Sequence, residues 1–185
     1  MKIAVYPGSF DPLHIGHQAI MEYLTREKEF DWVYLVITPQ NPFKDASKAL
    51  SAQERYEAAV DAVLRHPDLH VRVDDIELTL GTPSYTMRTL EALKLREPEN
   101  EFTLVIGADN LASFRGWREA GHILKEFGVV VFPRDGYDAE ALKDSLMEEC
   151  PGYRIAIMDA PLVNISSTWI REAITEGGDV SEFLM

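Results

Sequence analysis

Several features that mark other classes of protein are scarce or absent in this sequence. It has a single cysteine, Cys150, which excludes an internal disulfide bond and is typical of a reducing compartment. It has no apolar run of about 18 residues, the length that a transmembrane helix requires. Its first residues carry one lysine followed by strand-like residues, unlike a signal peptide. These absences predict a cytoplasmic protein that does not cross a membrane.

Basic residues are also scarce. The chain has 18 Lys and Arg against 31 Asp and Glu, which gives a net charge of −13. Binding to nucleic acid or to a membrane surface requires a basic face, so we expect neither partner. A polyphosphate would be repelled on average by this protein, and its site would need local cations. Mg²⁺ that binds through the phosphates of the substrate would supply one of them, and we predict no metal ion held by protein ligands alone.

Both usual phosphate-binding loops, Gly-x-Gly-x-x-Gly and Gly-x-x-x-x-Gly-Lys-Ser/Thr, are missing. The stretch 6–17 offers another anion site, because it follows an apolar run at 3–5 and precedes a helical pattern. Backbone N–H groups at a helix start favour phosphate, and two imidazoles, His14 and His17, could donate hydrogen bonds to it. The helix could begin at Pro12, after an Asp11 cap, or at Gly16. The stretch therefore predicts a nucleotide-phosphate site around the two histidines.

Strand-like and helical patterns alternate along the 185 residues, which we interpret as one domain, 1–185. Strands are expected at 2–6, 32–38, 70–73, 102–106, 129–132 and 154–158, with an extended piece at 74–80. Helices are expected at 16–28, after a Ser51 capping box, after Ser84, from Asp138 to Glu149, and after Ser166. This alternation predicts an α/β fold: a Rossmann-like, doubly wound, mainly parallel sheet of about five to six strands with helices on both faces.

Ligands of such sheets bind beyond the carboxyl ends of the strands, here the loops 7–17, 39–45, 107–117, 133–136 and 159–168. Two of these loops carry recognisable motifs: His14-Ile15-Gly16-His17, and the stretch Ile-Ser-Ser-Thr-Trp-Ile-Arg at 165–171. Together they resemble the nucleotidyltransferase superfamily, whose signatures are His-x-Gly-His and Ile-Ser-Ser-Thr-x-x-Arg. Within it, the chain resembles the bacterial nicotinate-nucleotide adenylyltransferases, with support from residues 84–86, 106–111 and 133–137. The resemblance covers nearly the whole chain.

The resemblance implies a reaction. ATP and nicotinate mononucleotide would give nicotinate adenine dinucleotide and pyrophosphate, a step of NAD synthesis, with Mg²⁺ as cofactor. The mononucleotide phosphate would attack in line, without a covalent enzyme intermediate. The variant Pro7-Gly8-Ser9 is nearer to pantetheine-phosphate adenylyltransferase, which is the first alternative. A non-catalytic nucleotide-binding protein on the same fold is the second.

The resemblance also implies roles for individual residues. In the catalytic set, His14 and His17 contact the phosphates of ATP and Arg171 contacts the leaving pyrophosphate. The remaining ATP-binding residues are Gly8, Ser9, Phe10, Gly107, Asp109, Ile165, Ser166 and Ser167. On the acceptor side, Thr86 and Trp117 form the nicotinate pocket, whereas Lys44 and Arg134 are candidates for phosphate contacts. Each of the last two could equally be a solvated loop charge.

Three properties stay open. The sequence does not decide between nicotinate and nicotinamide mononucleotide as acceptor. A homo-oligomer is one possible state. The stretch 39–45 departs from the Pro-Pro-His-Lys usual in the family, which leaves its mononucleotide contacts open, and the chain stops at Met185 where relatives continue into a short helix.

Overall fold

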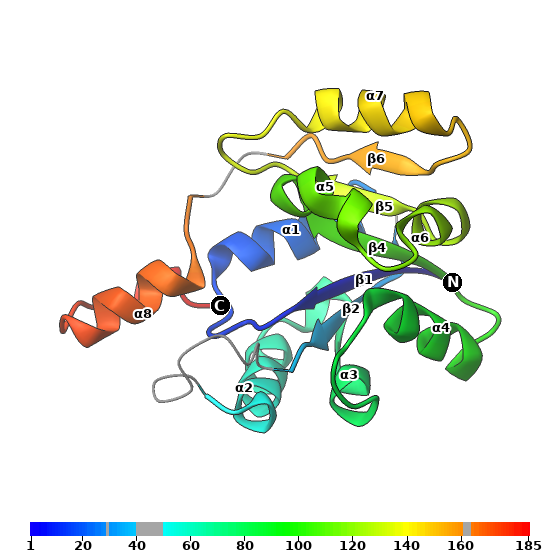
Figure 1. Cartoon of the computed structure of the whole chain (residues 1–185). Coiled ribbons are helices and arrows are strands. Elements are labelled where there is room, and N and C mark those ends of the chain that lie inside the picture. The colour runs from blue at the N-terminus through cyan, green and yellow to red at the C-terminus, as the bar shows by residue number, and fades with distance from the viewer. Residues whose placement is uncertain (29, 40–49, 161–163) are drawn as a thin grey trace.

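A computed structural model describes residues 1–28, 30–39, 50–160 and 164–185. Its centre is a sheet of parallel strands in the order β3-β2-β1-β4-β5-β6 (Figure 1). The strands are β1 (Lys2–Gly8), β2 (Trp32–Ile37), β3 (Val71–Asp74), β4 (Glu101–Gly107), β5 (Val129–Phe132) and β6 (Ile155–Ile157). This is the strand order of the Rossmann fold, so the predicted fold class is confirmed. The order reverses between β1 and β4, and ligands of such sheets bind at that point.

Helices cover both faces of the sheet. Strand side chains alternate between the faces, so Ile3 and Val5 enter one apolar cluster and Ala4 and Tyr6 the other. The cluster of Ala4 and Tyr6 is closed by α1 (Ile15–Arg26) and α2 (Ala52–Leu64). The opposite cluster is closed by α3 (Ile76–Thr79), α4 (Thr86–Arg96), α5 (Ala108–Ser113), α6 (Ala120–Glu126) and α7 (Ala139–Glu149). Short 3₁₀ turns occupy Pro67–Leu69, Phe114–Gly116 and Ser181–Phe183.

The last helix, α8 (Ser167–Thr175), lies apart from the sheet, on the side toward which β1 points (Figure 1). The residues after α8 return to the start of α1. Leu184 forms an antiparallel bridge with His14, and the side chain of Met185 is buried in the apolar cluster under α1 and α2. The segment after α8 therefore braces the turn between β1 and α1.

Three local expectations are wrong. The stretch 74–80 is not extended, because the carboxylate of Asp74 accepts a hydrogen bond from the backbone N–H of Ile76 and turns the chain into α3. Ser84 does not cap α4, whose N-cap is Tyr85. Helix α1 begins at neither Pro12 nor Gly16 but at Ile15, because the side chain of His14 caps it.

Ser51 and Asp138 cap α2 and α7 as expected. Within the four described ranges, no helix combines the length and the apolar character that crossing a bilayer demands.

Candidate active site

A cavity of about 890 Å³ opens at the carboxyl ends of β1 and β4, where the strand order reverses. Its volume falls in the range of about 300–1,000 Å³ that is usual for small-molecule sites. The cavity brings together most of the residues that the sequence singled out. They are Gly8, Ser9, Phe10, His14, His17, Thr86, Gly107, Trp117, Arg134, Ile165, Ser166, Ser167 and Arg171. Asp109 lies beside the cavity rather than in its wall, and Lys44 lies outside the described residues.

His14 and His17 form a capping box at the start of α1. Nδ1 of His14 accepts a hydrogen bond from the backbone N–H of Gly16 at 3.1 Å, and Nδ1 of His17 accepts one from the backbone N–H of His14 at 3.2 Å. The two rings stack with their centroids 3.7 Å apart. Because each Nδ1 is an acceptor, the proton of each neutral ring must be on Nε2. The capping therefore leaves two Nε2–H donors for a ligand in the cavity.

Both imidazoles are held in their neutral form. Burial, followed by the positive charge of Arg134, lowers the pKa of His14 from 6.5 to about 4. Burial also lowers the pKa of His17 well below its usual value, with smaller effects from His14 and Arg134. At neutral pH the pair therefore acts on a ligand as hydrogen-bond donors and not as cations.

The start of α8 is bonded to the turn between β1 and α1. The hydroxyl of Ser166 accepts from the backbone N–H of Trp169 at 3.1 Å, whereas that of Ser167 donates to the carbonyl of Pro12 at 3.0 Å. Nη1 of Arg171 donates to the carbonyl of Asp11 at 2.5 Å. The two sequence motifs thus form one continuous wall. The hydroxyls of both serines already have hydrogen-bond partners. The first backbone N–H groups of α8 are the donors that this helix start can offer to an anion.

The wall at the start of α4 has a different chemistry. Thr86 begins α4, and no side chain caps the N–H groups of that helix. The indole of Trp117 stacks on the buried ring of Phe114, with centroids 4.7 Å apart and planes at 29°. The carboxyl of Glu77, only 4% exposed, accepts from the hydroxyl of Thr89 at 2.8 Å, and burial raises its pKa. This end of the cavity therefore offers a flat aromatic ring beside an uncapped helix start.

Arg134 supplies a positive charge between the two walls. Its Nε lies 3.6 Å from Oδ1 of Asp109, and its guanidinium lies 5.0 Å from the centre of the Phe132 ring. A side chain at Gly107 would collide with Asp109 and would press on Phe132 at 3.1 Å and Arg134 at 3.2 Å. Glycine at 107 therefore lets this charged pair close over the end of β4.

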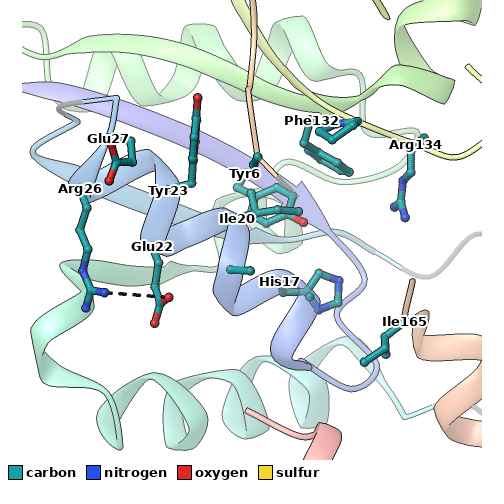
Figure 2. A pocket seen from close by; sticks show the side chains of 14 residues that line it. Tyr6, His17, Ile20, Glu22, Tyr23, Arg26, Glu27, Phe132, Arg134 and Ile165 are labelled. Atoms are coloured by element: carbon teal, nitrogen blue, oxygen red, sulfur yellow. Dashed lines mark ion pairs between the residues drawn. The ribbon is translucent and has the colours of Figure 1, made fainter. Parts of the chain in front are cut away.

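A second cavity of about 310 Å³ adjoins the first (Figure 2). Ile20 and Tyr23 of α1 line one side of it, and Phe132 and Arg134, at and after the end of β5, line the other. Its lining is more apolar than polar. It adjoins the main cavity, with which it shares five lining residues: Tyr6, His17, Phe132, Arg134 and Ile165. An apolar cavity next to several groups that donate hydrogen bonds to phosphate can hold a planar base.

Comparison with known proteins places the chain in a family. The model of the family described as cytidylyltransferase-like matches residues 5–173 of this sequence. A curated protein of Bacteroides fragilis, named "Probable nicotinate-nucleotide adenylyltransferase", is 39% identical over 99% of this chain and 87% of its own length. A protein of Flavobacterium johnsoniae with the same name is 36% identical over all of this chain and 92% of its own. The chain belongs to the nicotinate-nucleotide adenylyltransferase family. The family predicted from the two motifs is therefore confirmed.

Solved structures confirm the fold of this adenylyltransferase family member. The nicotinic acid mononucleotide adenylyltransferase of Plasmodium falciparum, solved in complex with NaAD, has a TM-score of 0.78 over 99% of this chain and 90% of its own, at 17% identity. A structure described as a putative nicotinate-nucleotide adenylyltransferase of Vibrio parahaemolyticus has a TM-score of 0.70 over all of this chain and 86% of its own, at 23% identity.

Sequence reasoning missed two polar residues of this region. Glu77 lies in the stretch expected to be extended, where nothing marked it as a cavity residue. Arg55 follows the Ser51 capping box on α2, and its burial depends on loops distant in sequence. Within the part of the chain that the structure describes, no three His, Cys, Asp or Glu side chains gather in a way that could hold a metal ion.

Proposed function

We propose that this chain transfers the adenylyl group of ATP to nicotinate mononucleotide, giving nicotinate adenine dinucleotide and pyrophosphate. One observation carries the proposal. The histidine pair and the start of α8 form a single anion-binding wall, and the same cavity has an aromatic ring and an uncapped helix start on another side. The names of the relatives support this substrate over phosphopantetheine.

At the phosphate wall, an oxygen of the acceptor phosphate attacks the α-phosphorus of ATP. The new P–O bond forms as the bond from the α-phosphorus to the bridging oxygen breaks, and that oxygen leaves with pyrophosphate. The Nε2–H groups of His14 and His17 donate to the α-phosphate. Arg171 and the backbone at Ser166 and Ser167 bind the leaving pyrophosphate. Such a reaction needs alignment and charge stabilisation rather than a protein nucleophile.

The adenine base has a place of its own in this proposal. The smaller cavity adjoins the phosphate wall at His17 and Ile165 and takes the purine between Tyr23 and Phe132. Gly107, the last residue of β4, and Asp109, in the first turn of α5, hold the ribose side of adenosine. The glycine turn at Gly8, Ser9 and Phe10 wraps the nucleotide.

The acceptor occupies the opposite end of the main cavity. The indole of Trp117 stacks on the pyridine ring, and the N–H groups at the start of α4, near Thr86, donate hydrogen bonds to its carboxylate, since a helix start favours an anion. Arg134 contacts phosphate between the two substrates. A contact from Lys44 stays a prediction, as do the cytoplasmic location, the absence of nucleic-acid partners and a homo-oligomeric state.

The residues of the cavity fit Mg²⁺ that arrives bound to ATP. Among the described residues that line the main cavity, the one carboxylate is that of Glu77, which is bonded to Thr89 at the acceptor end. The donors to the ion would then be phosphate oxygens and water, which is common for Mg²⁺. When bound, the ion neutralises part of the phosphate charge that the net charge of −13 would otherwise repel.

A substrate panel tests the proposal. The protein is incubated with ATP, Mg²⁺ and one acceptor at a time: nicotinate mononucleotide, nicotinamide mononucleotide or phosphopantetheine. Pyrophosphate release and the mass of the product are measured. We expect nicotinate mononucleotide to be used fastest, whereas turnover only with phosphopantetheine would contradict the choice of substrate.

The His17→Ala variant is the control for catalysis. It removes one donor to the α-phosphate and should lower the rate by about 10²-fold or more. A wild-type rate no higher than that of His17→Ala would exclude the enzyme and favour the non-catalytic nucleotide-binding protein.

A further inference from the structure

Arg55 is the largest of the fully buried side chains, only 2% exposed. Its guanidinium donates to three backbone carbonyls: Nη1 to Ser9 at 2.7 Å, Nη2 to Thr38 at 2.9 Å and Nε to Leu50 at 3.4 Å. Ser9 belongs to the turn after β1, Thr38 follows β2, and Leu50 precedes the cap of α2. One side chain of α2 thus binds the segments that leave two neighbouring strands. Ser9 and Thr38 also line the main cavity.

The carbonyl of Ser9 directly precedes an unusual residue. Phe10 has a φ of +47°, in the left-handed region that residues other than glycine rarely adopt. Such conformations persist where surrounding contacts fix them. The bond from Arg55 fixes the peptide between Ser9 and Phe10 from the N-terminal side.

The ring of Phe10 transmits this position to the histidine pair. It packs edge-on against Tyr6 at 5.2 Å and against His17 at 5.0 Å between ring centroids. It also covers Gly8 so closely that a Cβ there would approach the ring to 2.8 Å. A change in the backbone at Ser9 would therefore move the Phe10 ring and, with it, the imidazole of His17.

We propose that Arg55 is a positioning residue for adenylyl transfer: through Ser9 and Phe10 it holds the ring of His17 where Nε2–H meets the α-phosphate. The part of this inference that concerns rate rests on the proposed function. The part that concerns the position of the His17 ring does not.

Only arginine suits this role. Its planar guanidinium carries five N–H donors, so it reaches three carbonyls at once, whereas the ammonium of lysine is a compact point charge. Burial lowers the pKa of Arg55, and the negative charge of Asp11 opposes that shift, so the guanidinium stays charged. A charged donor also makes stronger hydrogen bonds to carbonyls than a neutral one.

Three variants separate positioning from simple stabilisation. Arg55→Met removes all three hydrogen bonds, and Arg55→Lys keeps the charge without the planar fork. Ala62→Gly is the matched control, because it lies on the same helix, is buried, and weakens α2 without touching the cavity. For each protein we would measure kcat, KM for both substrates, the thermal midpoint, and the NMR shifts of the His17 ring without substrate.

We expect Arg55→Met to lower kcat by about 10- to 100-fold, because a small misplacement of a catalytic group can cost that much. Its His17 signals should move, since the neighbouring Phe10 ring turns. The kcat and the His17 shifts of Arg55→Lys should lie between those of Arg55→Met and those of the wild type. Ala62→Gly should lose thermal stability but keep both kcat and the His17 shifts.

Two results would overturn the inference. One is unchanged His17 shifts and unchanged kcat in a folded Arg55→Met or Arg55→Lys protein. The other is a loss of kcat in Ala62→Gly as large as that in the Arg55 variants, when the thermal midpoints of these proteins are equal. If Arg55→Met does not fold, Arg55→Lys decides between the same outcomes. Moved His17 shifts in a protein whose wild type shows no turnover would refute the proposed function and leave the positioning role intact.

Discussion

On the proposed function, His14 carries out two tasks with two different nitrogen atoms, and substitutions can separate them. Its Nδ1 caps α1 by accepting from the backbone N–H of Gly16, whereas its Nε2–H is free for the α-phosphate. His14→Asn keeps an acceptor at the cap, because asparagine is among the best N-cap residues, but it loses the Nε2 donor. His14→Ala loses both groups.

The expected magnitudes follow from this division. Loss of the cap in His14→Ala should cost about 1 kcal/mol of unfolding free energy. For a chain of this length, that corresponds to a fall of about 2–4 °C in the thermal midpoint. The thermal midpoint of His14→Asn should fall by less than that of His14→Ala. Both variants should lose about 10²- to 10³-fold in kcat, since each lacks one preorganised donor to the transition state.

Two measurements check this pair. Differential scanning calorimetry without substrate gives the thermal midpoints, and pyrophosphate release at saturating ATP and nicotinate mononucleotide gives kcat. Wild-type kcat in His14→Asn would refute the donor role of Nε2. An unchanged midpoint in His14→Ala would instead refute the capping role of Nδ1.

Two further predictions concern pH and Arg171. The pKa of His14 is lowered from 6.5 to about 4 in the folded state, so the unfolded chain binds more protons between these values. The unfolding free energy should therefore fall as the pH drops from about 6.5 to 4, by up to about 3 kcal/mol from this residue, and urea titrations should show a smaller fall in His14→Asn. Arg171→Lys keeps the charge but loses the planar donors that reach Asp11 and Thr168. It should lower kcat by about 10-fold or more with little loss of stability. A kcat equal to that of the wild type would contradict a role for the guanidinium geometry.

The sequence predicted the architecture because it follows from local patterns, whereas most of the cavity residues were predicted from the resemblance to the nucleotidyltransferase motifs. Short apolar runs and capping boxes identify the strands and helices, and their alternation predicts a parallel sheet with its ligand site at the carboxyl edge. The start of α1 could not be predicted in this way. Asp11 and Pro12 have the residue types of a cap and a first helical position, whereas the actual cap, His14, is not among the usual capping residues.

The roles of Arg55 and Glu77 depend on contacts between distant segments. Arg55 follows a capping box on a helix whose charged residues are otherwise exposed or partly exposed among those described, and only the folded chain shows that Ser9 and Thr38 surround its guanidinium. Glu77 is buried by packing of α3 on α4, where Thr89 donates to it. A polar residue that belongs to a buried network cannot be told from a solvated one by its neighbours in sequence.

The bonds from Ser167 to Pro12 and from Arg171 to Asp11 join residues 155 and 160 positions apart. During synthesis, the turn after β1 leaves the ribosome long before these partners exist. A nascent chain that stops before Ser166 can build most of the sheet but has only half of the anion-binding wall. On the proposed function, the capacity to bind ATP therefore depends on residues that are synthesised after the strands of the sheet. A proteolytic cut between β6 and α8 would remove that capacity while leaving those strands uncut.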